Sequence, residues 1–571
     1  MSAKSPLKVV LYWHMHQPEY RDMRTGLYHL PWTYLHAIKD YVDMAEHIHS
    51  IPEARAVINF APVLLDQIND YSEQISDYLN KNTLIRDPLL SALAEPVLPV
   101  SGESRIELIK NCLRANEKRM IHRYPSFQKI VELANYVMEH KSAIHYLSDQ
   151  MLVDILVWYH LAWVGETVRR KDLRIKQLLK KESGYTHHDR ILLVTVIGEI
   201  CSGLIGQYRS LVESGQIELS MSPYAHPIVP LMLDINSAQE AMPDVALPAL
   251  SVYPGGEERV HWHLRKGIET FEKYFGYKPQ GCWPSEGGVS DATLKLLSEY
   301  GFRWTATGET VLTNSLNNHE NHLSEAAQLQ RTHTPYRLDG TNINCFFRDD
   351  GLSDLIGFTY SDWHADDAVA NLVHHLGNIA QACKNDHDTV VSIILDGENA
   401  WEYYFENGYY FLNALYDTLG KHPDIELTTF SECLASGITP KPLSHIVAGS
   451  WVYGTFSTWI GDPDKNRAWD MLGEAKLVYD LTIASGKFTE QQLQELEQQL
   501  AICEGSDWFW WFGDYNPAQS VSSFEHLFRL NLSNLYSLLG KDAPYYLAET
   551  FTHGSKAPVA DGVMRPGQER A

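Results

Sequence analysis

Two carboxylates stand at the ends of predicted strands, each in a setting that would present an acid to solvent. Glu286 follows a short apolar run at residues 281–283 and is surrounded by Trp, Pro and Gly. Asp396 ends a second apolar run, residues 390–395, and is followed by Gly397 and Glu398. Two acids on two strand ends are what a carboxylate-pair mechanism requires, in which one group is ionised and the other holds a proton.

Two histidines, His14 and His16, stand at the end of another predicted strand, residues 8–13. Catalytic groups of parallel α/β barrels gather where strands end, because the loops of that face converge. Taken singly, each group has an ordinary structural explanation: such a histidine often satisfies a local hydrogen bond, and Asp-Gly is a common turn. The occurrence of all four groups at strand ends favours an active site.

Strand-like and helical patterns alternate along the chain and predict a mainly parallel α/β sheet or barrel. The expected strands lie at residues 8–13, 55–62, 216–221, 281–283, 304–307, 343–347, 389–395 and 425–427. We predict an irregular barrel over residues 1–440, with a helical insertion at about 64–187. A helical C-terminal domain that completes the cleft is expected over 441–545, and a mobile tail over 546–571.

The net charge and the aromatic content of the chain indicate which kinds of ligand it binds. The formal net charge of -25 disfavours nucleic acid and anionic membranes, because both polyanions would be repelled. Fifteen Trp and thirty-one Tyr are many for 571 residues and suit a neutral, flat-faced ligand such as a carbohydrate, although such rings also fill cores. Seven scattered Cys without a CxxC pair, and an N-terminus without signal-peptide character, predict a cytoplasmic protein.

Five ordered motifs resemble those of glycoside hydrolase family 57. They are His-Met-His-Gln-Pro at 14–18, Pro-Tyr-Ala-His-Pro-Ile-Val-Pro-Leu at 223–231, Cys-Trp-Pro-Ser-Glu at 282–286, Leu-Asp-Gly-Glu-Asn-Ala-Trp at 395–401 and Gly-Ser-Asp-Trp at 505–508. The resemblance implies a (β/α)7 barrel followed by a helical domain. It also implies action on α-glucans or malto-oligosaccharides with retention of anomeric configuration.

On this resemblance, Glu286 matches the nucleophile and Asp396 the general acid/base, with Glu398 tuning or orienting the site. A retaining mechanism needs carboxyl groups about 5 to 5.5 Å apart. The resemblance further implies substrate contacts at His14, His16, Gln17, His226, Trp283, Glu398, Trp401, Asp507 and Trp508. The three tryptophans are expected to stack on glucose, and the domain that carries Asp507 is expected to close over the barrel. No metal or other cofactor is expected.

Several reactions remain open at this level. The His-Gln-Pro and Trp-Pro-Ser-Glu forms look more like the α-amylase and amylopullulanase members, which favours hydrolysis of α-1,4-glucan with or without α-1,6 cleavage. Branching members usually lack that Gln and have a Cys beside the nucleophile, where this chain has Gly287. 4-α-Glucanotransfer is the alternative within the family. Two alternatives belong to other classes of protein. One is a metal-dependent barrel hydrolase, with His14 and His16 as half of a zinc site, and the other is a non-catalytic glycan-binding protein.

The segment 346–354 is similar to one in amylase-like members of the family. Within it, Arg348 or Asp354 either orients the nucleophile or caps a helix. The oligomeric state is left open, because an acidic surface suits a monomer or a small closed oligomer equally well.

Overall fold

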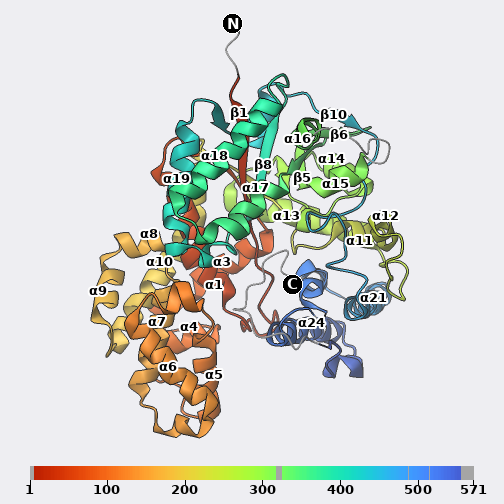
Figure 1. The fold of residues 1–571 in the computed structure, drawn as a ribbon. Coiled ribbons are helices and arrows are strands. Elements are labelled where there is room, and N and C mark those ends of the chain that lie inside the picture. Colours follow the sequence, from red (N-terminus) through yellow and green to blue (C-terminus); the bar gives the residue numbers. More distant parts are fainter. Residues whose placement is uncertain (1–4, 317–324, 487, 514, 554–571) are drawn as a thin grey trace.

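A computed structural model describes residues 5–316, 325–486, 488–513 and 515–553, and its centre is a ring of seven parallel strands (Figure 1). In spatial order these are β1 (Leu7–Met15), β2 (Ala56–Phe60), β3 (Ile217–Met221), β4 (Gly281–Cys282), β5 (Trp304–Gly308), β7 (Asn344–Arg348) and β8 (Val390–Asp396). β8 pairs with β1 along its length and with β7 through Ser392 and Arg348, which closes the ring. The predicted irregular (β/α)7 barrel is thereby confirmed.

The barrel strands are short apolar runs buried on both faces, as parallel strands covered by helices must be. Three further strands extend the sheet: β6 (Tyr336–Leu338), β9 (Ile425–Leu427) and β10 (Lys441–Leu443). β9 pairs with β1, β6 runs antiparallel to β7, and β10 pairs with β6. Because β10 belongs to this sheet, the predicted domain boundary at residue 440 is one strand too early.

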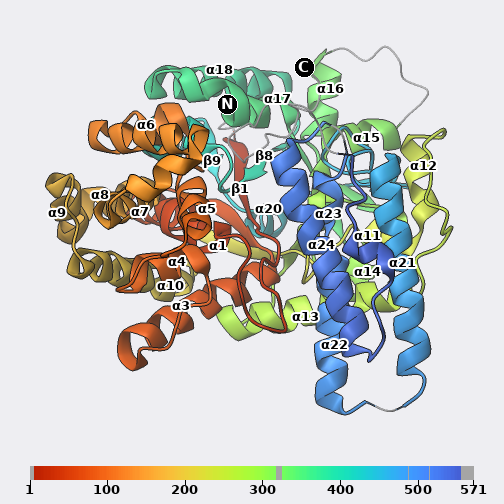
Figure 2. The same ribbon diagram turned by 90° about the horizontal axis from the view of Figure 1, so that it is seen from below.

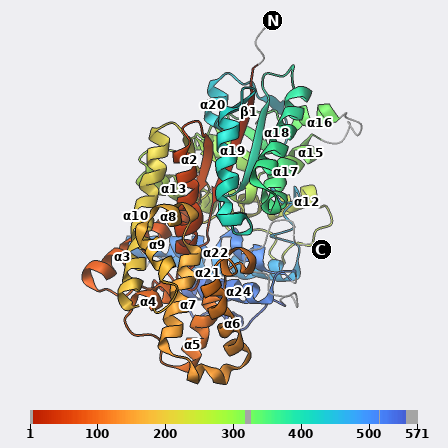
Figure 3. The ribbon, with the colours of Figure 1, turned by 60° about the vertical axis from the view of Figure 1, so that its left-hand side comes forward.

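Helices cover the outside of the barrel, and their ends carry recognisable signals. Helix α10 (His187–Glu213) begins with a capping box between Thr186 and Asp189, and α13 (Gly256–Phe275) ends at Gly276 with φ 83°. Figure 3 shows α10, α2 (Val42–Ser50) and α19 (Tyr409–Lys421) in a row beside β1. The other helices of this layer are α1 (Trp32–His36), α3 (Pro62–Lys81), α11 (Val229–Leu233), α12 (Ala238–Ala241), α14 (Asp291–Glu299), α15 (Glu309–Ser315), α16 (Glu325–Thr332), α17 (Asp350–Asp354), α18 (Ala365–Ala382) and α20 (Phe430–Ala435).

Six helices form a lobe between β2 and β3, within the range predicted for the helical insertion. They are α4 (Pro88–Ala94), α5 (Gly102–Cys112), α6 (Pro125–Glu139), α7 (Asp149–Trp163), α8 (Glu166–Lys171) and α9 (Leu173–Lys181). The helices before and after the lobe, α3 and α10, contact each other, and they also contact α13 and β3 of the barrel. The lobe is therefore continuous with the helical layer of the barrel. In Figure 1 it lies at the end of the barrel opposite the label N.

In the part of the chain that the structure describes, four α-helices follow the last strand: α21 (Pro463–Ile483), α22 (Glu490–Cys503), α23 (Ser506–Trp511) and α24 (Ala518–Leu538). They lie at the same end of the barrel as the α4–α9 lobe but on its other side, which Figure 2 shows from below. The chain then packs back on these helices, because Phe551 contacts Phe512 and its backbone N–H donates to Glu525. The predicted tail over 546–571 is therefore wrong up to residue 553, and residues 554–571 lie outside the described part.

Two general features bear on the predicted environment of the protein. All seven cysteines are buried and unpaired. By length and composition alone, α10 could cross a membrane, a property that core helices of soluble proteins share. In this chain α10 packs against α2, α3 and α4, and 39% of its most apolar window is buried.

Candidate active site

A cleft of about 850 Å³ opens at the carboxyl end of the barrel strands, and both predicted acids line it. Glu286 follows β4 and Asp396 ends β8. β4 and β8 lie on opposite sides of the ring: going round it from β4, β8 is the third strand in one direction and the fourth in the other. The two acids therefore face each other across the mouth of the barrel. Residues of α1 form one wall of the cleft, and residues of α23 and α24 form another.

Glu286 occupies a tight turn with φ 59°, a left-handed conformation that is uncommon for a residue other than glycine. Both oxygens of its buried carboxyl accept hydrogen bonds: Oε1 from the Ser506 hydroxyl at 3.2 Å and Oε2 from the Trp451 indole at 3.3 Å. The backbone N–H of Trp451 also donates to the Glu286 carbonyl, at 3.2 Å. The strained turn is thus fixed from two sides, which is the usual condition for keeping such a conformation.

Asp396 is half-buried, and its Oδ2 accepts a hydrogen bond of 2.8 Å from the Asn399 amide. The turn after it requires glycine, because a Cβ on Gly397 would lie 2.1 Å from the sulfur of Met15. The backbone N–H of Gly397 donates to the carbonyl of His14 at 2.7 Å. β1 and the end of β8 are therefore fixed together, with the histidine segment beside the acid.

Burial raises the pKa of several acids that share the cleft. Burial, then the charges of Asp507 and Asp396, raise the pKa of Glu286 well above its usual range, against the hydrogen bonds from Trp451 and Ser506. Burial raises the pKa of Asp396 to about 6, although the Asn399 hydrogen bond opposes the rise. Burial and the Asp396 charge raise the pKa of Glu398. Such a cluster titrates jointly and retains protons near neutral pH, as a general acid requires.

Three imidazole rings stack beside these acids. His16 and His226 lie 3.8 Å apart between ring centroids, and His14 lies 5.1 Å from His226. Burial, together with the neighbouring imidazole of His16, lowers the pKa of His14 to about 3 and that of His226 well below its usual range. Both rings are therefore neutral at pH 7 and can each offer one donor and one acceptor nitrogen.

The partners of His226 define its tautomer. When Glu286 is ionised, Ser506 gives its single hydroxyl proton to Glu286, and the contact of 2.9 Å between Ser506 Oγ and His226 Nδ1 then requires the imidazole to donate. The Nε2 atom of His226 is then an acceptor, and it is buried without a hydrogen-bond partner among the described residues. His226 is 1% exposed and does not line the cleft, so the structure places this predicted substrate contact behind the cleft wall, beside Glu286.

The helical domain supplies part of the site. Asp507, at the start of α23, lies 2.9 and 3.0 Å from Nε2 of His16 through its two oxygens. The backbone N–H of Ser506 donates to the carbonyl of His226 at 2.8 Å. A buried cluster just before α23 holds this junction: Glu504 accepts from Arg259 at 2.9 to 3.1 Å and from His263 at 2.8 Å. Arg259 and His263 belong to the barrel helix α13, and the hydroxyl of Tyr253, just before this helix, also donates to Glu504, at 2.6 Å.

Glu398 and Gln17 form another wall of the cleft. Glu398 Oε1 accepts from the Gln17 amide at 3.1 Å and from the Tyr41 hydroxyl at 3.3 Å. Its Oε2 has no hydrogen-bond partner in the described part of the chain. The loop after β1 that carries Gln17 is tied to α3, since the Gln67 amide donates to the Pro18 carbonyl at 2.9 Å.

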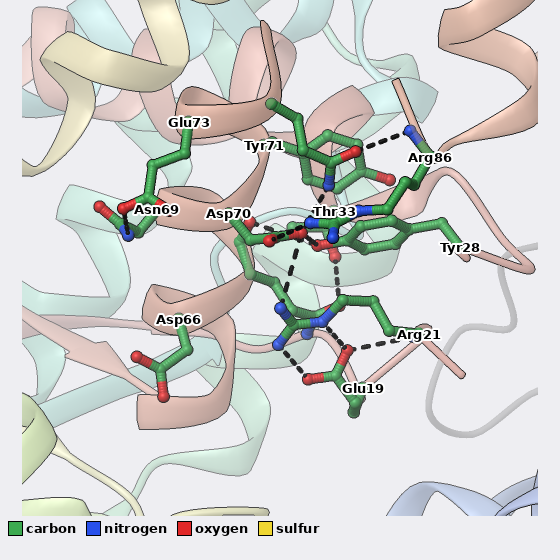
Figure 4. A network of polar contacts seen from close by, with 12 residues as sticks. Glu19, Arg21, Tyr28, Thr33, Asp66, Asn69, Asp70, Tyr71, Glu73 and Arg86 are labelled. Atoms are coloured by element: carbon green, nitrogen blue, oxygen red, sulfur yellow. Dashed lines mark hydrogen bonds and ion pairs between the residues drawn. The ribbon is translucent and has the colours of Figure 1, made fainter. Parts of the chain in front are cut away.

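A network of charges holds the outer part of the same loop (Figure 4). Arg21 donates to both oxygens of Glu19, at 2.8 and 2.7 Å, and lies 3.5 Å from Asp70 of α3. Asp70 also accepts from Arg86 at 2.9 Å and from the Tyr28 hydroxyl at 3.0 Å. These contacts give the cleft wall a rigid support outside the cleft itself.

The prediction that three tryptophans stack on glucose is wrong. Trp283, Trp401 and Trp508 are at most 1% exposed and do not line the cleft. Trp283 packs inside the barrel, Trp401 packs on Trp13, and Trp508 donates its indole N–H to the Ile502 carbonyl. The aromatic side chains that do line the cleft are Tyr20, Trp32, Trp451, Trp510, Trp511 and Phe524.

Of these, Trp510 and Trp511 belong to the aromatic run 509–512, a pattern in the sequence that predicts aromatic surface at the cleft and fits packing between the domains at least as well. Trp451 lies in an irregular segment without any such pattern.

Arg348 has a structural position at the edge of the cleft. Its guanidinium donates to the Ile394 carbonyl, to Asp350 and to Asp354, at 2.9, 2.5 and 2.7 Å. The cap of α17 is Asp349 instead, whose side chain accepts from the backbone of Leu352. Neither predicted role, orienting the nucleophile or capping a helix, is therefore supported by a contact of Arg348 or Asp354.

The part of the chain that the structure describes has one group of side chains that could hold a metal, and it contains His16 but not His14, the other half of the predicted zinc pair. Ligand atoms of His16, His226 and Asp507 lie within 4.8 Å of one another. Imidazole binds a metal through a lone pair in the ring plane, and two stacked rings 3.8 Å apart direct these lone pairs side by side. The set fits a tetrahedral metal poorly, since its ligands would have to converge on one point.

The barrel and its cleft define the class: an α/β-barrel protein with an acid-lined cleft at the carboxyl ends of the strands. The profile of glycosyl hydrolase family 57 matches residues 10–446, most of the chain. The protein therefore belongs to glycosyl hydrolase family 57.

Curated and solved relatives agree with this placement. A 1,4-alpha-glucan branching enzyme from Thermococcus kodakarensis is 20% identical to this chain over 371 residues. The match covers 53% of this chain and 51% of the relative, so the chain spans about half the length of that relative. The crystal structure of a family 57 branching enzyme from the same organism, in complex with glucose, has a TM-score of 0.57 at 16% identity and covers 93% of this chain and 90% of its own.

Two other solved structures share the fold. That of the α-amylase AmyC from Thermotoga maritima has a TM-score of 0.55 at 13% identity, with 94% and 93% coverage. That of a 4-alpha-glucanotransferase from Thermococcus litoralis has a TM-score of 0.50 at 15% identity, covering 93% of this chain and 60% of its own.

Proposed function

We propose that this protein cleaves α-1,4-linked glucan with retention of configuration, through a glycosyl-enzyme intermediate on Glu286. The observation that carries the proposal is the pair of acids facing each other across one cleft at the barrel mouth. A glucose unit between them would meet a nucleophile on one side and a proton donor on the other. The relatives named above act on α-glucans or carry names of glucan-active enzymes, which supports this substrate class.

The hydrogen bonds of the two acids suit these roles. Donors to both oxygens of Glu286 stabilise the ionised form that attacks C1 of the sugar, and they oppose the rise in its pKa that burial and the charges of Asp507 and Asp396 cause. Asp396 receives one such bond and has a pKa raised to about 6, so it can hold the proton that the departing oxygen takes. Asp396 then accepts a proton from water as the bond between C1 and Glu286 breaks.

The remaining groups bind and orient the sugar. Neutral His14 hydrogen-bonds to a sugar hydroxyl, and the Oε2 atom of Glu398 accepts from another. Trp510 and Trp511 offer aromatic faces on which further glucose units pack. These roles follow from the side chains that face the cleft.

Glucanotransfer is the second candidate, and a specific observation favours it. A second pocket adjoins the cleft at Asp396, so a sugar hydroxyl can approach the acid/base group from that side. The glycosyl-enzyme is common to both reactions, and they differ in whether water or a hydroxyl attacks C1. The named relatives include a branching enzyme and a 4-alpha-glucanotransferase.

One experiment tests the proposal and separates the candidates. Purified protein is incubated with maltoheptaose, amylose and pullulan, and products are resolved by length and by new reducing ends. Shorter products with a matching rise in reducing ends support hydrolysis, and release of maltotriose from pullulan shows α-1,6 cleavage. Products both longer and shorter than maltoheptaose, without new reducing ends, support transfer. No change in any of the three glucans would refute the proposal.

The proposed compartment is the cytoplasm, because seven buried, unpaired thiols suit a reducing environment. Fractionation of the source cells with an antibody against the protein tests this.

A further inference from the structure

A second pocket, of about 880 Å³, shares one wall with the cleft. Asp396, Asn399 and Trp451 line both spaces, whereas Glu286 lines the cleft alone. In a retaining mechanism the acid/base group contacts the oxygen between two sugars, and the nucleophile contacts only the sugar whose C1 it attacks. The sugar that keeps the oxygen must therefore lie on the side of Asp396 away from Glu286.

We propose that the second pocket binds the departing part of the glucan and the incoming acceptor sugar, with the ring of Tyr453 as the platform on which that sugar stacks. This inference rests on the proposed function. It adds a binding site and a residue that decides the competition between water and a sugar hydroxyl for the glycosyl-enzyme.

The lining of the pocket suits a sugar. Phe358, Trp451 and Tyr453 supply aromatic faces, and Tyr453 is 46% exposed. Asp350 and Asp354 lie at the edge, where Arg348 orients both carboxylates. A mainly apolar, aromatic pocket with a few fixed polar groups is typical of a small-molecule site, and carboxylates accept hydrogen bonds from hydroxyls.

The backbone conformation of Tyr453 is a second, independent observation that supports a binding role for this residue. Its φ is 57°, in the left-handed region, where a bulky aromatic residue is strained. Gly454 follows with φ 66°, so the turn places two residues in succession in this region. Nearly half of Tyr453 is exposed, so the side chain is accessible to a ligand. A strained residue that presents its ring at a pocket points to binding.

The turn at residues 453 and 454 is also fixed in position relative to Glu286, the proposed nucleophile. The backbone of Gly449 pairs with Val289, and the Trp451 N–H donates to the Glu286 carbonyl. A Cβ on Gly454 would lie 2.5 Å from the methyl group of Thr310, so the turn fits closely on α15. The distance between the platform and the reacting carboxyl is thus fixed by contacts within a few residues of each.

The consequence concerns the second half of the reaction. The acceptor hydroxyl attacks C1, its proton passes to Asp396, and the bond between C1 and the Glu286 oxygen breaks, which returns the carboxylate. A sugar held on Tyr453 raises the local concentration of hydroxyl over that of water. Loss of the ring should therefore weaken acceptor use more than it weakens formation of the intermediate.

The test uses full-length Tyr453→Gly, because glycine adopts φ 57° without strain and the fold should keep its melting temperature. Two donors are compared: maltoheptaose, whose leaving chain occupies the second pocket, and α-maltosyl fluoride, whose fluoride does not. We expect kcat/KM to fall about tenfold more for maltoheptaose than for the fluoride, since one aromatic contact contributes about that factor. The concentration of added maltotriose that half-saturates transfer should rise by a similar factor.

Two further variants keep the test decisive. Tyr453→Phe retains the ring and should give the wild-type ratio between donors. Tyr453→Asn lacks the ring and also tolerates the left-handed region, so it should reproduce the glycine variant if the ring is what matters. Equal losses for both donors, or a normal response to maltotriose in both ringless variants, would overturn the inference. If the wild-type protein turns over neither donor, the proposed function itself fails instead.

Discussion

Removal of the amide that hydrogen-bonds Asp396 gives a direct test of its role as general acid. The Asn399 amide donates to Oδ2 at 2.8 Å and lowers the pKa of Asp396, against the effect of burial. Since that pKa is about 6, the acid is protonated in roughly one molecule in ten at pH 7. The wild-type kcat/KM should therefore fall about tenfold per pH unit above an apparent pKa near 6.

In Asn399→Ala the carboxylate loses a charge-assisted hydrogen bond, so its protonated form becomes relatively more stable. Such bonds contribute about 1.5 to 3 kcal/mol, and one pKa unit corresponds to about 1.4 kcal/mol. Asp396 is half-buried, and water replaces part of the lost interaction, so the lower end applies. The alkaline limb of the profile should move to higher pH by about one unit.

The assay is kcat/KM for maltoheptaose between pH 4 and pH 9, with Trp510→Phe as the matched control. Trp510 lines the same cleft but has no recorded contact with Asp396, so its variant should lower the rate without moving the alkaline limb. The assignment of Asp396 as the acid would be refuted by an alkaline limb that stays in place in Asn399→Ala, or moves toward acid.

Three further outcomes follow from the site and its supports. Glu286→Gln should bring maltoheptaose turnover below detection while the calorimetric Kd changes less than about threefold, because the amide retains the shape but cannot attack C1. Glu504→Gln should lower the free energy of unfolding, measured in urea, by about 3 to 5 kcal/mol, because Arg259 stays buried without its partner. Burial raises the pKa of Glu504, but Arg259 and His263 outweigh this effect and lower the pKa from 4.5 to about 2. The ionised carboxylate therefore stabilises the fold fully above pH 4.5, and this contribution is lost as the pH falls toward 2. The unfolding free energy of Glu504→Gln should lack this dependence on acid pH. Incubation with EDTA should leave kcat/KM unchanged, and a loss restored by zinc would favour the metal-dependent alternative.

The barrel was predictable because its strands are short, mainly apolar runs that alternate with amphipathic helices. Each run identified in the sequence became a strand of the structure, including the β4 strand of two residues before Glu286. β6 and β10 escaped prediction because their pairing depends on distant segments, and β10 also contains Pro442, a residue that is uncommon within strands. The packing of residues up to 553 on α24 could not be read from composition either.

The acids and histidines were also predictable, because a strand end fixes where the next side chain goes. The aromatic contacts were not, because tryptophan serves the core and a ligand equally well. Trp283 and Trp401 lie close in sequence to the acids, yet both rings point into the core. Trp451 lies far from either acid in sequence and still donates to Glu286. Proximity along the chain therefore predicted the wrong rings.

The segment after β10 forms part of the cleft and is not an appendage to the barrel. The family profile ends at residue 446, yet Glu286, the proposed nucleophile, accepts hydrogen bonds from two residues beyond that point, Trp451 and Ser506. Ser506 also bonds both the backbone carbonyl and the imidazole of His226, which has φ 60°. Glu286 and His226 thus keep strained backbones beside partners supplied by the segment after β10, and such strain persists only where surrounding contacts impose it. Docking of α23 through Glu504 is therefore a condition for the catalytic geometry, so loss of that contact should lower activity through the position of the nucleophile as well as through stability.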